Sequence, residues 1–297
     1  MNESFLVYNE PVFRPPSEAN SVILQITHGC KWNQCNFCEM YTSKSYSVKS
    51  LSTIKKEIIL LSGMYPATKR VFIGDGDLFT VDYHTMLKAI KLIKEGFPAL
   101  QRISTYASSR ELMRFSPEQL NEIKATGLDL LYIGLESGDD AVLKLMNKGV
   151  SAEIQAKACI KAKAAGFRLS VMILNGLGGK QHTLNHALSS AALLNKIQPD
   201  ILALLVISFP YGYEHFRARV NANFEPLSQL EMLKEMRLLL SKLELEQTVF
   251  RSDHASNYLV FKGGLNRDKD RFIKQLDHII EHTIHVPSPH LNESKRL

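Results

Sequence analysis

The stretch that decides the fold is a cysteine-rich loop directly after the first apolar run of the chain, Thr27-His28-Gly29-Cys30-Lys31-Trp32-Asn33-Gln34-Cys35-Asn36-Phe37-Cys38. It holds three of the four cysteines, and the fourth, Cys159, lies far along the sequence. Thiolates gathered on one short loop bind soft metals, so the loop predicts zinc, Cu(I) or an iron-sulfur cluster. Three ligands leave one position of a four-ligand site open, and open positions are where metal chemistry takes place.

The composition is that of an ordinary globular chain. With 297 residues, 45% hydrophobic and 22% charged, the chain is long enough for one large domain or two small ones. No apolar run approaches the roughly 20 residues that a bilayer span needs, and residues 1–20 are polar and contain proline, unlike a signal peptide. We therefore predict a cytoplasmic protein with no membrane partner, in a reducing environment that keeps cysteines as thiols.

Apolar runs of strand length alternate with longer amphipathic segments. The predicted strands are residues 22–27, 70–74, 102–106, 130–135, 168–174 and 201–208. The predicted helices are residues 51–62, 83–95, 117–125, 139–146, 152–165 and 183–196. This alternation is typical of parallel strands joined by crossover helices. Six βα pairs are too few to close the eight-stranded barrel, so we predict an α/β fold, a partial (β/α)6 TIM-like barrel whose active face is the carboxyl end of the strands.

The pattern changes after Glu225-Pro226. Residues 230–245 and 267–283 have helical spacing, residues 248–250 predict a last strand, and residues 251–258 form a polar loop. The final residues, 285–297, are predicted to fray. We therefore predict three parts: an N-terminal extension at 1–20, the barrel core at 21–225, and a C-terminal helical and loop cap at 226–297 that supplies substrate contacts.

A closed structural zinc site is one interpretation of the cysteine loop. It needs four ligands, and Cys30, Cys35, Cys38 and His28 would supply them. His28 and Cys30 are so close in sequence that tetrahedral geometry on one loop would be strained, and a chain with this much core has little need of a structural metal. A non-catalytic, zinc-clipped binding protein is therefore the less favoured alternative, and metal analysis would identify it.

The loop resembles that of the radical S-adenosylmethionine (radical SAM) superfamily, in which a three-cysteine loop after the first strand holds a 4Fe-4S cluster. The usual spacing there is C-x3-C-x2-C, whereas this chain has C-x4-C-x2-C with an aromatic residue, Phe37, between the last two cysteines. Further segments are similar to a subgroup described as radical SAM Fe-S oxidoreductases. They are Arg14-Pro15-Pro16-Ser17-Glu18, Gly74-Asp75-Gly76-Asp77, Leu131-Tyr132-Ile133-Gly134-Leu135-Glu136-Ser137-Gly138 and Arg251-Ser252-Asp253-His254-Ala255-Ser256-Asn257-Tyr258.

The resemblance implies an oxygen-sensitive enzyme. Its 4Fe-4S cluster would be held by Cys30, Cys35 and Cys38, with S-adenosylmethionine (SAM) on the fourth iron. Reductive cleavage of SAM would give a 5'-deoxyadenosyl radical that abstracts a hydrogen atom from the substrate. A low-potential electron donor of the flavodoxin or ferredoxin type is implied as well, and oxidoreductase, isomerase and lyase reactions are all compatible with this chemistry.

Residues at the carboxyl ends of the strands are the predicted SAM contacts. The resemblance assigns the ribose to Glu136, the carboxylate to Lys148, the adenine to Phe37 and the glycine turn after the fifth strand, and the ammonium to the turn after the second strand. Ser104 and Tyr106 share one face of the third strand by alternation and would contact cofactor or substrate. The complete predicted set is Phe37, Gly74, Asp75, Gly76, Asp77, Ser104, Tyr106, Glu136, Lys148, Gly176 and Leu177.

Substrate groups are predicted in residues 251–258, which gather a cation, an imidazole, an amide and a phenol. Arg251 and Asn257 are the predicted substrate-binding residues, and His254 and Tyr258 the predicted catalytic ones. An imidazole titrates near neutrality and so suits a general acid or base, although a hydrogen-bonded structural role is the alternative for His254.

The sequence favours a small molecule as the substrate. A net charge of +6 and a pI near 9.0 permit the alternative of a transfer-RNA-modifying radical SAM enzyme. The basic residues of this chain are spread along the sequence rather than clustered, however, and a nucleic-acid partner is therefore disfavoured.

Overall fold

Parallel strands joined by helices make up most of the described structure, which covers residues 8–220 and 223–282 of a computed structural model. Contacts divide these residues into two units. The first contains the residues up to Asn33, Cys38–Ile133 and Ile160–Arg168, and the second contains Gln34–Phe37, Gly134–Cys159 and the residues from Leu169 onward. Each unit is described by itself below.

The strands of the first unit are parallel. Their order is β1 (Val22–Gln25), β4 (Arg70–Gly74), β5 (Arg102–Tyr106) and β6 (Leu128–Glu136). In β4 the run from Val71 to Ile73 is fully buried, as expected of a parallel strand that is covered on both faces. Parallel neighbours bring their carboxyl ends to one edge, so the loops after β1, β4 and β5 begin at the same side of this sheet.

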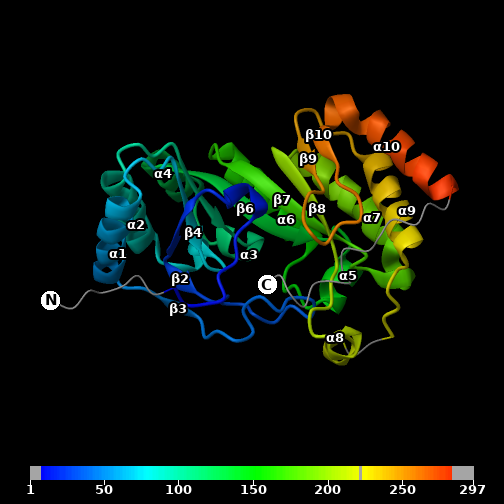
Figure 1. The fold of residues 1–297 in the computed structure, drawn as a ribbon, viewed down its shortest axis with the longest axis horizontal. Helices are drawn as coiled ribbons and strands as arrows, with labels where there is room; N and C mark the ends of the chain where they lie inside the picture. The colour runs from blue at the N-terminus through cyan, green and yellow to red at the C-terminus, as the bar shows by residue number, and fades with distance from the viewer. Residues whose placement is uncertain (1–7, 221–222, 283–297) are drawn as a thin grey trace. The chain divides into compact units, whose positions relative to one another are not determined.

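Helices α1 (Leu51–Met64), α2 (Tyr83–Gly96) and α4 (Pro117–Thr126) join these strands, and α1 contacts α2 (Figure 1). Each begins at a side chain that accepts from an unsatisfied backbone N–H: Ser50, Asp82 and Ser116. Such caps contribute about 1 kcal/mol each. A Cβ on Gly96 would lie 2.3 Å from Ile58, so the glycine is what allows α1 and α2 to approach closely. Short turns at η1 (Pro16–Glu18), η2 (Leu78–Thr80) and α3 (Ser109–Leu112) complete the unit.

A two-residue antiparallel ribbon follows β1. Its strands are β2 (Thr27–His28) and β3 (Ser47–Val48), with Thr27 opposite Val48 and His28 opposite Ser47. The sequence predicted one strand through residue 27, but the chain leaves the parallel sheet after Gln25. The cysteine loop therefore starts and ends at this ribbon.

The second unit has parallel strands β7 (Arg168–Asn175), β8 (Ile201–Val206) and β9 (Val249–Arg251), and β10 (Lys262–Gly264) returns antiparallel to β9. Its longer helices are α7 (Gly179–Ile197), α9 (Gln229–Lys242) and α10 (Leu265–Glu281), and α9 contacts both α7 and α10 (Figure 1). A reciprocal capping box between Ser228 and Glu231 begins α9. The shorter helices are α5 (Asp140–Leu145) and α8 (Tyr213–Val220), and α6 (Ala152–Ala164) has residues in both units.

The six predicted strands and six predicted helices are confirmed, with boundary shifts. The largest shift is in α7, which begins at Gly179 rather than at residue 183. The elements β3, β10, α3 and α8 were not predicted from the sequence. Arg251 was predicted to lie in a loop, but it is the last residue of β9. The predicted frayed tail at 285–297 lies outside the described residues. Of the helices in residues 8–220 and 223–282, none combines the length and apolar character that crossing a membrane requires.

Candidate cofactor site

The cysteine loop presents three accessible thiols. Cys30, Cys35 and Cys38 are partly exposed, whereas Cys159 is completely buried in α6, and none of the four is in a disulfide. Asn33 lies between the first two cysteines and adopts a left-handed conformation (φ 42°). Its Nδ2 donates to the carbonyl of Tyr41 at 2.8 Å. A left-handed residue turns the chain sharply, and asparagine tolerates that conformation better than most residues do.

The turn after β4 packs directly on the start of this loop. The Gly76 N–H donates to the Gly29 carbonyl at 3.1 Å. A Cβ on Gly76 would lie 2.8 Å from that oxygen and 3.0 Å from both Cα and Cβ of Cys30. Only glycine therefore fits between the turn and the cysteine. The turn also contains a cis peptide bond between Gly74 and Asp75.

Asp75 is buried and its carboxylate is fully engaged. One oxygen accepts from Gln25 Nε2 at 3.0 Å, and the other accepts from the Gly29 N–H at 3.0 Å and from Lys44 Nζ at 2.8 Å. Both side chains of the Lys44–Asp75 ion pair are essentially inaccessible to water. The side chain predicted to contact SAM is thus directed into the base of the cysteine loop.

Asp77 connects the same turn to the loop after β5. Its carboxylate accepts from the Phe79 N–H at 2.9 Å, from the Ser108 N–H at 3.0 Å and from the Ser108 hydroxyl at 2.5 Å. Burial raises the pKa of Asp77 to about 7, although these three donors act to lower it. Asp77 therefore titrates near neutrality within a hydrogen-bonded turn.

Ser104 and Tyr106 on β5 have different surroundings. Ser104 is fully buried, and its hydroxyl has no hydrogen-bond partner within the described residues. Tyr106 packs edge-on against Phe72 and Tyr132, and burial raises the pKa of its phenol. An unsatisfied buried hydroxyl costs free energy, so Ser104 and Tyr106 differ in how well their polar groups are accommodated.

In the second unit, the segment Gln34–Phe37 docks on the residues after α5. Asn36 binds this stretch twice, from its N–H to the Met146 carbonyl and from its Nδ2 to the Leu145 carbonyl, both at 2.9 Å. Asn147 Nδ2 donates to the Gln34 carbonyl at 3.0 Å, and Arg219 of α8 donates to the Cys35 carbonyl at 2.7 Å. These bonds fix the backbone on both sides of Cys35.

This docking brings three predicted SAM contacts together. Lys148 Nζ lies 3.0 Å from a Glu136 carboxylate oxygen and 5.7 Å from the centre of the Phe37 ring. Glu136 is left-handed (φ 65°), and its carboxylate occupies the space that a Cβ on Gly134 would fill. A non-glycine residue held in that region stores strain, a property that is common at functional sites.

The turn at Gly176 is held by hydrogen bonds to residues that were not predicted from the sequence to be part of the site. The Gly176 N–H donates to Glu235 Oε1 at 2.6 Å. His186, left unassigned from sequence, hydrogen-bonds Ser137 Oγ through Nδ1 at 2.8 Å and the Leu174 carbonyl through Nε2 at 3.0 Å. A carbonyl only accepts, so Nε2 donates to the Leu174 carbonyl, and the same nitrogen lies 3.7 Å from Glu235 Oε1. No sequence motif marks this buried network.

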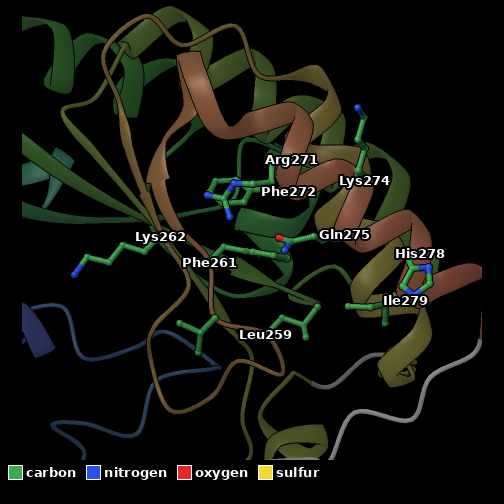
Figure 2. Close-up of a pocket in the computed structure, with 10 residues that line it drawn as sticks. Leu259, Phe261, Lys262, Arg271, Phe272, Lys274, Gln275, His278 and Ile279 are labelled. Atoms are coloured by element: carbon green, nitrogen blue, oxygen red, sulfur yellow. The ribbon is translucent and has the colours of Figure 1, made fainter.

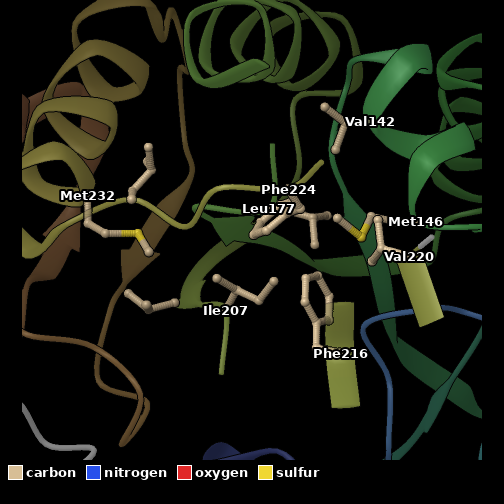
Figure 3. Close-up of a cluster of buried hydrophobic side chains, with 10 residues drawn as sticks. Val142, Met146, Leu177, Ile207, Phe216, Val220, Phe224 and Met232 are labelled. Carbon is tan, nitrogen blue, oxygen red and sulfur yellow. The ribbon is translucent and has the colours of Figure 1, made fainter. Parts of the chain in front are cut away.

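Leu177 belongs to an apolar cluster rather than to a surface (Figure 3). Its side chain is fully buried, which leaves only its backbone for a ligand contact. Two partly buried rings that were predicted to be functional, Phe37 and Tyr258, pack against the same cluster. The other buried members are Val142, Met146, Val206, Ile207, Phe216, Val220, Phe224, Leu227 and Met232.

The predicted substrate residues are only partly available. His254 Nδ1 accepts from the Ser256 N–H at 3.2 Å, so the neutral imidazole carries its proton on Nε2. Asn257 Nδ2 donates to the Leu204 carbonyl at 2.8 Å. Asn257 Oδ1 and Arg251 Nε are buried and have no partner within the described part of the chain.

A groove of about 1000 Å³ lies between the β10 region and α10 (Figure 2). Its floor is apolar, and Lys262, Arg271, Lys274 and His278 line it. None of the predicted site residues is among those that line it.

The cysteine loop fits an iron-sulfur cluster by its donors. Three accessible thiols in one loop are the ligand type and number that a site-differentiated 4Fe-4S cluster uses. Glycine at position 76 leaves Cys30 covered only by backbone on that side. In residues 8–220 and 223–282, no three Cys, His, Asp or Glu side chains are already grouped closely enough to hold a metal ion.

Comparisons with known proteins agree on one family. Residues 24–191 match the sequence model described as the radical SAM superfamily. A search of curated proteins found no match. Among solved structures, coproporphyrinogen III oxidase (HemN) from Escherichia coli, described as a radical SAM enzyme, is 19% identical with a TM-score of 0.59. The similarity covers 75% of this chain and 52% of that chain, so this chain spans about half its length.

Two further structures have similar folds. Methylornithine synthase (PylB) is 19% identical with a TM-score of 0.52, over 92% of this chain and 85% of that chain. The radical SAM methyltransferase TsrM from Kitasatospora setae, solved with cobalamin and a 4Fe-4S cluster, is 17% identical with a TM-score of 0.52, over 64% and 38%. At such identities the likeness concerns the fold, and it confirms the predicted α/β class, a partial TIM-like barrel.

Proposed function

Because the chain belongs to the radical SAM superfamily, we propose that it cleaves SAM reductively at a 4Fe-4S cluster and removes a hydrogen atom from a small-molecule substrate. Members of the superfamily are enzymes that use this cluster and SAM, and they need a reductant and a substrate. When bound, the two groups supply an electron and a carbon-centred radical, while the protein supplies binding, orientation and exclusion of water.

The observation that carries the proposal is the meeting of Phe37, Glu136 and Lys148 beside the fixed backbone of Cys35. An aromatic ring, a carboxylate and an ammonium are the groups that an adenosine and an amino-acid carboxylate need. Glu136 would accept from ribose hydroxyls, and Lys148 would pair with the methionine carboxylate of SAM as a point charge. Cys30, Cys35 and Cys38 would hold the cluster.

The substrate residues are assigned to the C-terminal segment. Arg251 would bind an anionic group of the substrate, and Asn257 Oδ1 would accept a hydrogen bond from it. His254 would donate through Nε2, because its Nδ1 already accepts from the backbone. The electron donor would be a flavodoxin or ferredoxin, and a reducing cytoplasm would keep the four cysteines as thiols.

The test is anaerobic reconstitution with iron and sulfide, reduction with dithionite, and chromatography for 5'-deoxyadenosine after SAM is added. We expect 5'-deoxyadenosine from the wild type and none from Cys30→Ala, Cys35→Ala or Cys38→Ala. Cys159→Ala is the matched control, because this thiol is completely buried, and it should retain the activity. Bound zinc without SAM cleavage in a folded wild type would contradict the proposal and favour the zinc-clipped alternative.

A second variant separates cleavage from substrate chemistry. His254→Ala should keep the iron content and 5'-deoxyadenosine formation of the wild type, because His254 is assigned to the substrate and not to the cluster. Loss of the cluster in this variant would show that His254 supports the fold instead.

The second candidate is modification of transfer RNA, and the groove beside α10 is the observation that supports it. Lys262, Lys274 and Arg271, which also pairs with Asp268 at 3.3 Å, line this groove, and such cations would bind phosphates with a strong salt dependence. The measurement is binding of transfer RNA at 50 and 200 mM salt, with a Lys262→Glu, Lys274→Glu double variant. Unchanged binding by that variant would remove this support.

A further inference from the structure

A single carboxylate oxygen connects the two limbs of the cysteine loop. Asp75 Oδ2 accepts from the Gly29 N–H, on the limb that leaves β2, and from Lys44 Nζ, on the limb that returns to β3. The distances are 3.0 and 2.8 Å. Gly29 immediately precedes Cys30, so the bond fixes the peptide from which that cysteine projects.

The surrounding contacts keep this arrangement dry and rigid. Asp75 Oδ1 accepts from Gln25 Nε2 at 3.0 Å, and the Asp75 N–H donates to the Thr27 carbonyl at 3.0 Å. Lys44 Nζ also donates to the Asn9 carbonyl. Both charged side chains are at most 1% exposed. Every donor that reaches Asp75 is therefore held without competition from water.

Stability alone is a poor explanation for this pair. A buried ion pair often contributes no more than well-packed apolar side chains of the same volume would, because both charges lose their hydration. Here the pair does what apolar residues cannot, since it accepts from the peptide beside Cys30 and attaches the opposite limb of the loop to the same atom. Its value lies in the position that it fixes.

We infer that Asp75 and Lys44 are positioning residues for the cluster: together they hold Cys30 in place and keep two opposite charges balanced beside it. The inference rests on the proposed function, because it takes Cys30 as a cluster ligand. Charges close to an iron-sulfur cluster shift its reduction potential. Removing one member of the pair leaves the other buried and uncompensated next to the ligand.

The charge balance gives opposite expectations for the two single variants. Lys44→Met leaves a carboxylate and should shift the midpoint potential of the cluster to more negative values. Asp75→Asn leaves an ammonium and should shift the potential to more positive values. The double variant leaves neither charge and should return close to the wild-type value. A purely structural role would shift both single variants in the same direction or not at all.

Loop order gives a second readout that needs no cluster. In cluster-free protein, we expect the amides of Gly29 and Cys30 to exchange at least about tenfold faster in both single variants, because the bond to Asp75 or its attachment to the other limb is lost. The double variant should also exchange faster, and it keeps the proposal testable if a single variant fails to fold, because it buries no charge. Lys49→Met is the matched control: Lys49 pairs with Glu57 at 2.6 Å in the same unit and does not contact Asp75.

The experiment combines hydrogen exchange of the cluster-free proteins with redox titration of the reconstituted proteins, followed by electron paramagnetic resonance. Opposite potential shifts in the single variants, a wild-type potential in the double variant and no change in Lys49→Met would support the inference. Shifts in the same direction, or wild-type exchange at Gly29 and Cys30 in all variants, would overturn it. Failure of the wild type to assemble a cluster would refute the proposed function instead, and the exchange measurement would still decide whether the pair orders the loop.

Discussion

Gly76→Ala tests whether the turn after β4 and the cysteine loop are fitted to each other at the backbone. The new methyl group would lie 2.8 Å from the Gly29 oxygen and 3.0 Å from Cα and Cβ of Cys30. Two of these three atoms belong to the main chain, so the conflict is not removed by rotating a side chain. The loop, the turn or both must move.

The expected cost follows from three terms. Overpacking costs about 1–3 kcal/mol, and loss of the hydrogen bond from the Gly76 N–H to the Gly29 carbonyl costs about 0.5–1.5 kcal/mol. Replacing glycine also reduces the freedom of the unfolded chain, which offsets about 0.4–1 kcal/mol. The net loss of unfolding free energy should therefore be about 0.5–4 kcal/mol, from the addition of one methyl group.

Gly63→Ala is the matched control. Gly63 is exposed near the end of α1, and a Cβ there would meet no atom within 4 Å. In a helix, alanine is favoured over glycine by about 0.5–1 kcal/mol, so this variant should be slightly more stable than the wild type. The same chemical change is thus expected to have opposite signs at the two positions.

The assay is equilibrium urea unfolding of the cluster-free proteins, followed by measurement of iron release to a chelator after reconstitution. Displacement of Cys30 should weaken the hold on iron about tenfold or more in Gly76→Ala, in line with the cost of disturbing residues that support metal ligands. If Gly76→Ala matches Gly63→Ala in both stability and iron retention, the turn does not constrain the cysteine, and the reasoning is refuted.

Three further predictions concern buried or paired charges. Burial raises the pKa of Asp77 to about 7, above its unfolded value of 3.8, so the folded state binds the extra proton and the unfolding free energy should fall as pH rises from about 4 to about 7. The unfolding free energy of the wild type should differ between pH 5 and pH 8, and Asp77→Asn should remove about 3 kcal/mol of that difference. An unchanged dependence of the unfolding free energy on pH, measured by urea unfolding, would contradict this. Lys148→Met should weaken SAM binding in equilibrium dialysis, whereas Lys157→Met, which removes an exposed pair, should not; equal affinities would exclude the role of Lys148. Glu235→Ala should cost about 1–3 kcal/mol because it leaves the Gly176 N–H without its acceptor, while Glu235→Gln should cost less, and equal melting temperatures for the two variants would refute this.

The sequence predicted the long elements well, because their signals are local. The run from Val71 to Ile73 is apolar and is followed by glycine, and the predicted strand at 70–74 is β4 without change. Helix α4 is capped by Ser116 and begins at Pro117, and the helix predicted from the sequence begins at the same proline. Strands and helices of this kind are determined by periodicity and caps, which are visible without a structure.

The short elements were not predicted, because they are too short to carry such local signals. The ribbon strand β3 has two residues and β10 has three, and neither has room for a periodic pattern. Their existence depends on a partner strand that is distant in sequence. Helix α8 has only eight residues, and its buried pair Phe216 and Val220 is too short a pattern to mark a helix in a sequence.

The residues of the candidate site were predictable where a sequence motif contains them. They were not predictable where a residue distant in sequence holds a site residue in place. Phe37, Glu136 and Lys148 were selected from sequence, and the structure brings them together. Lys44 and Glu235 were not selected, because a lysine or glutamate outside a motif is usually a solvated surface residue. Their burial beside Asp75 and Gly176 is a property of the fold, and sequence periodicity does not encode it.

The ribbon formed by β2 and β3 closes the cysteine loop at its base. Because the two strands pair at the base, both ends of residues 29–46 are anchored at neighbouring positions, whatever lies between them. Closing such a loop becomes only slowly more costly as residues are added, so one extra residue between the first two cysteines changes the loop and leaves the sheet undisturbed. A change in the spacing of the cysteines is therefore absorbed within the loop rather than in the two strands that anchor it.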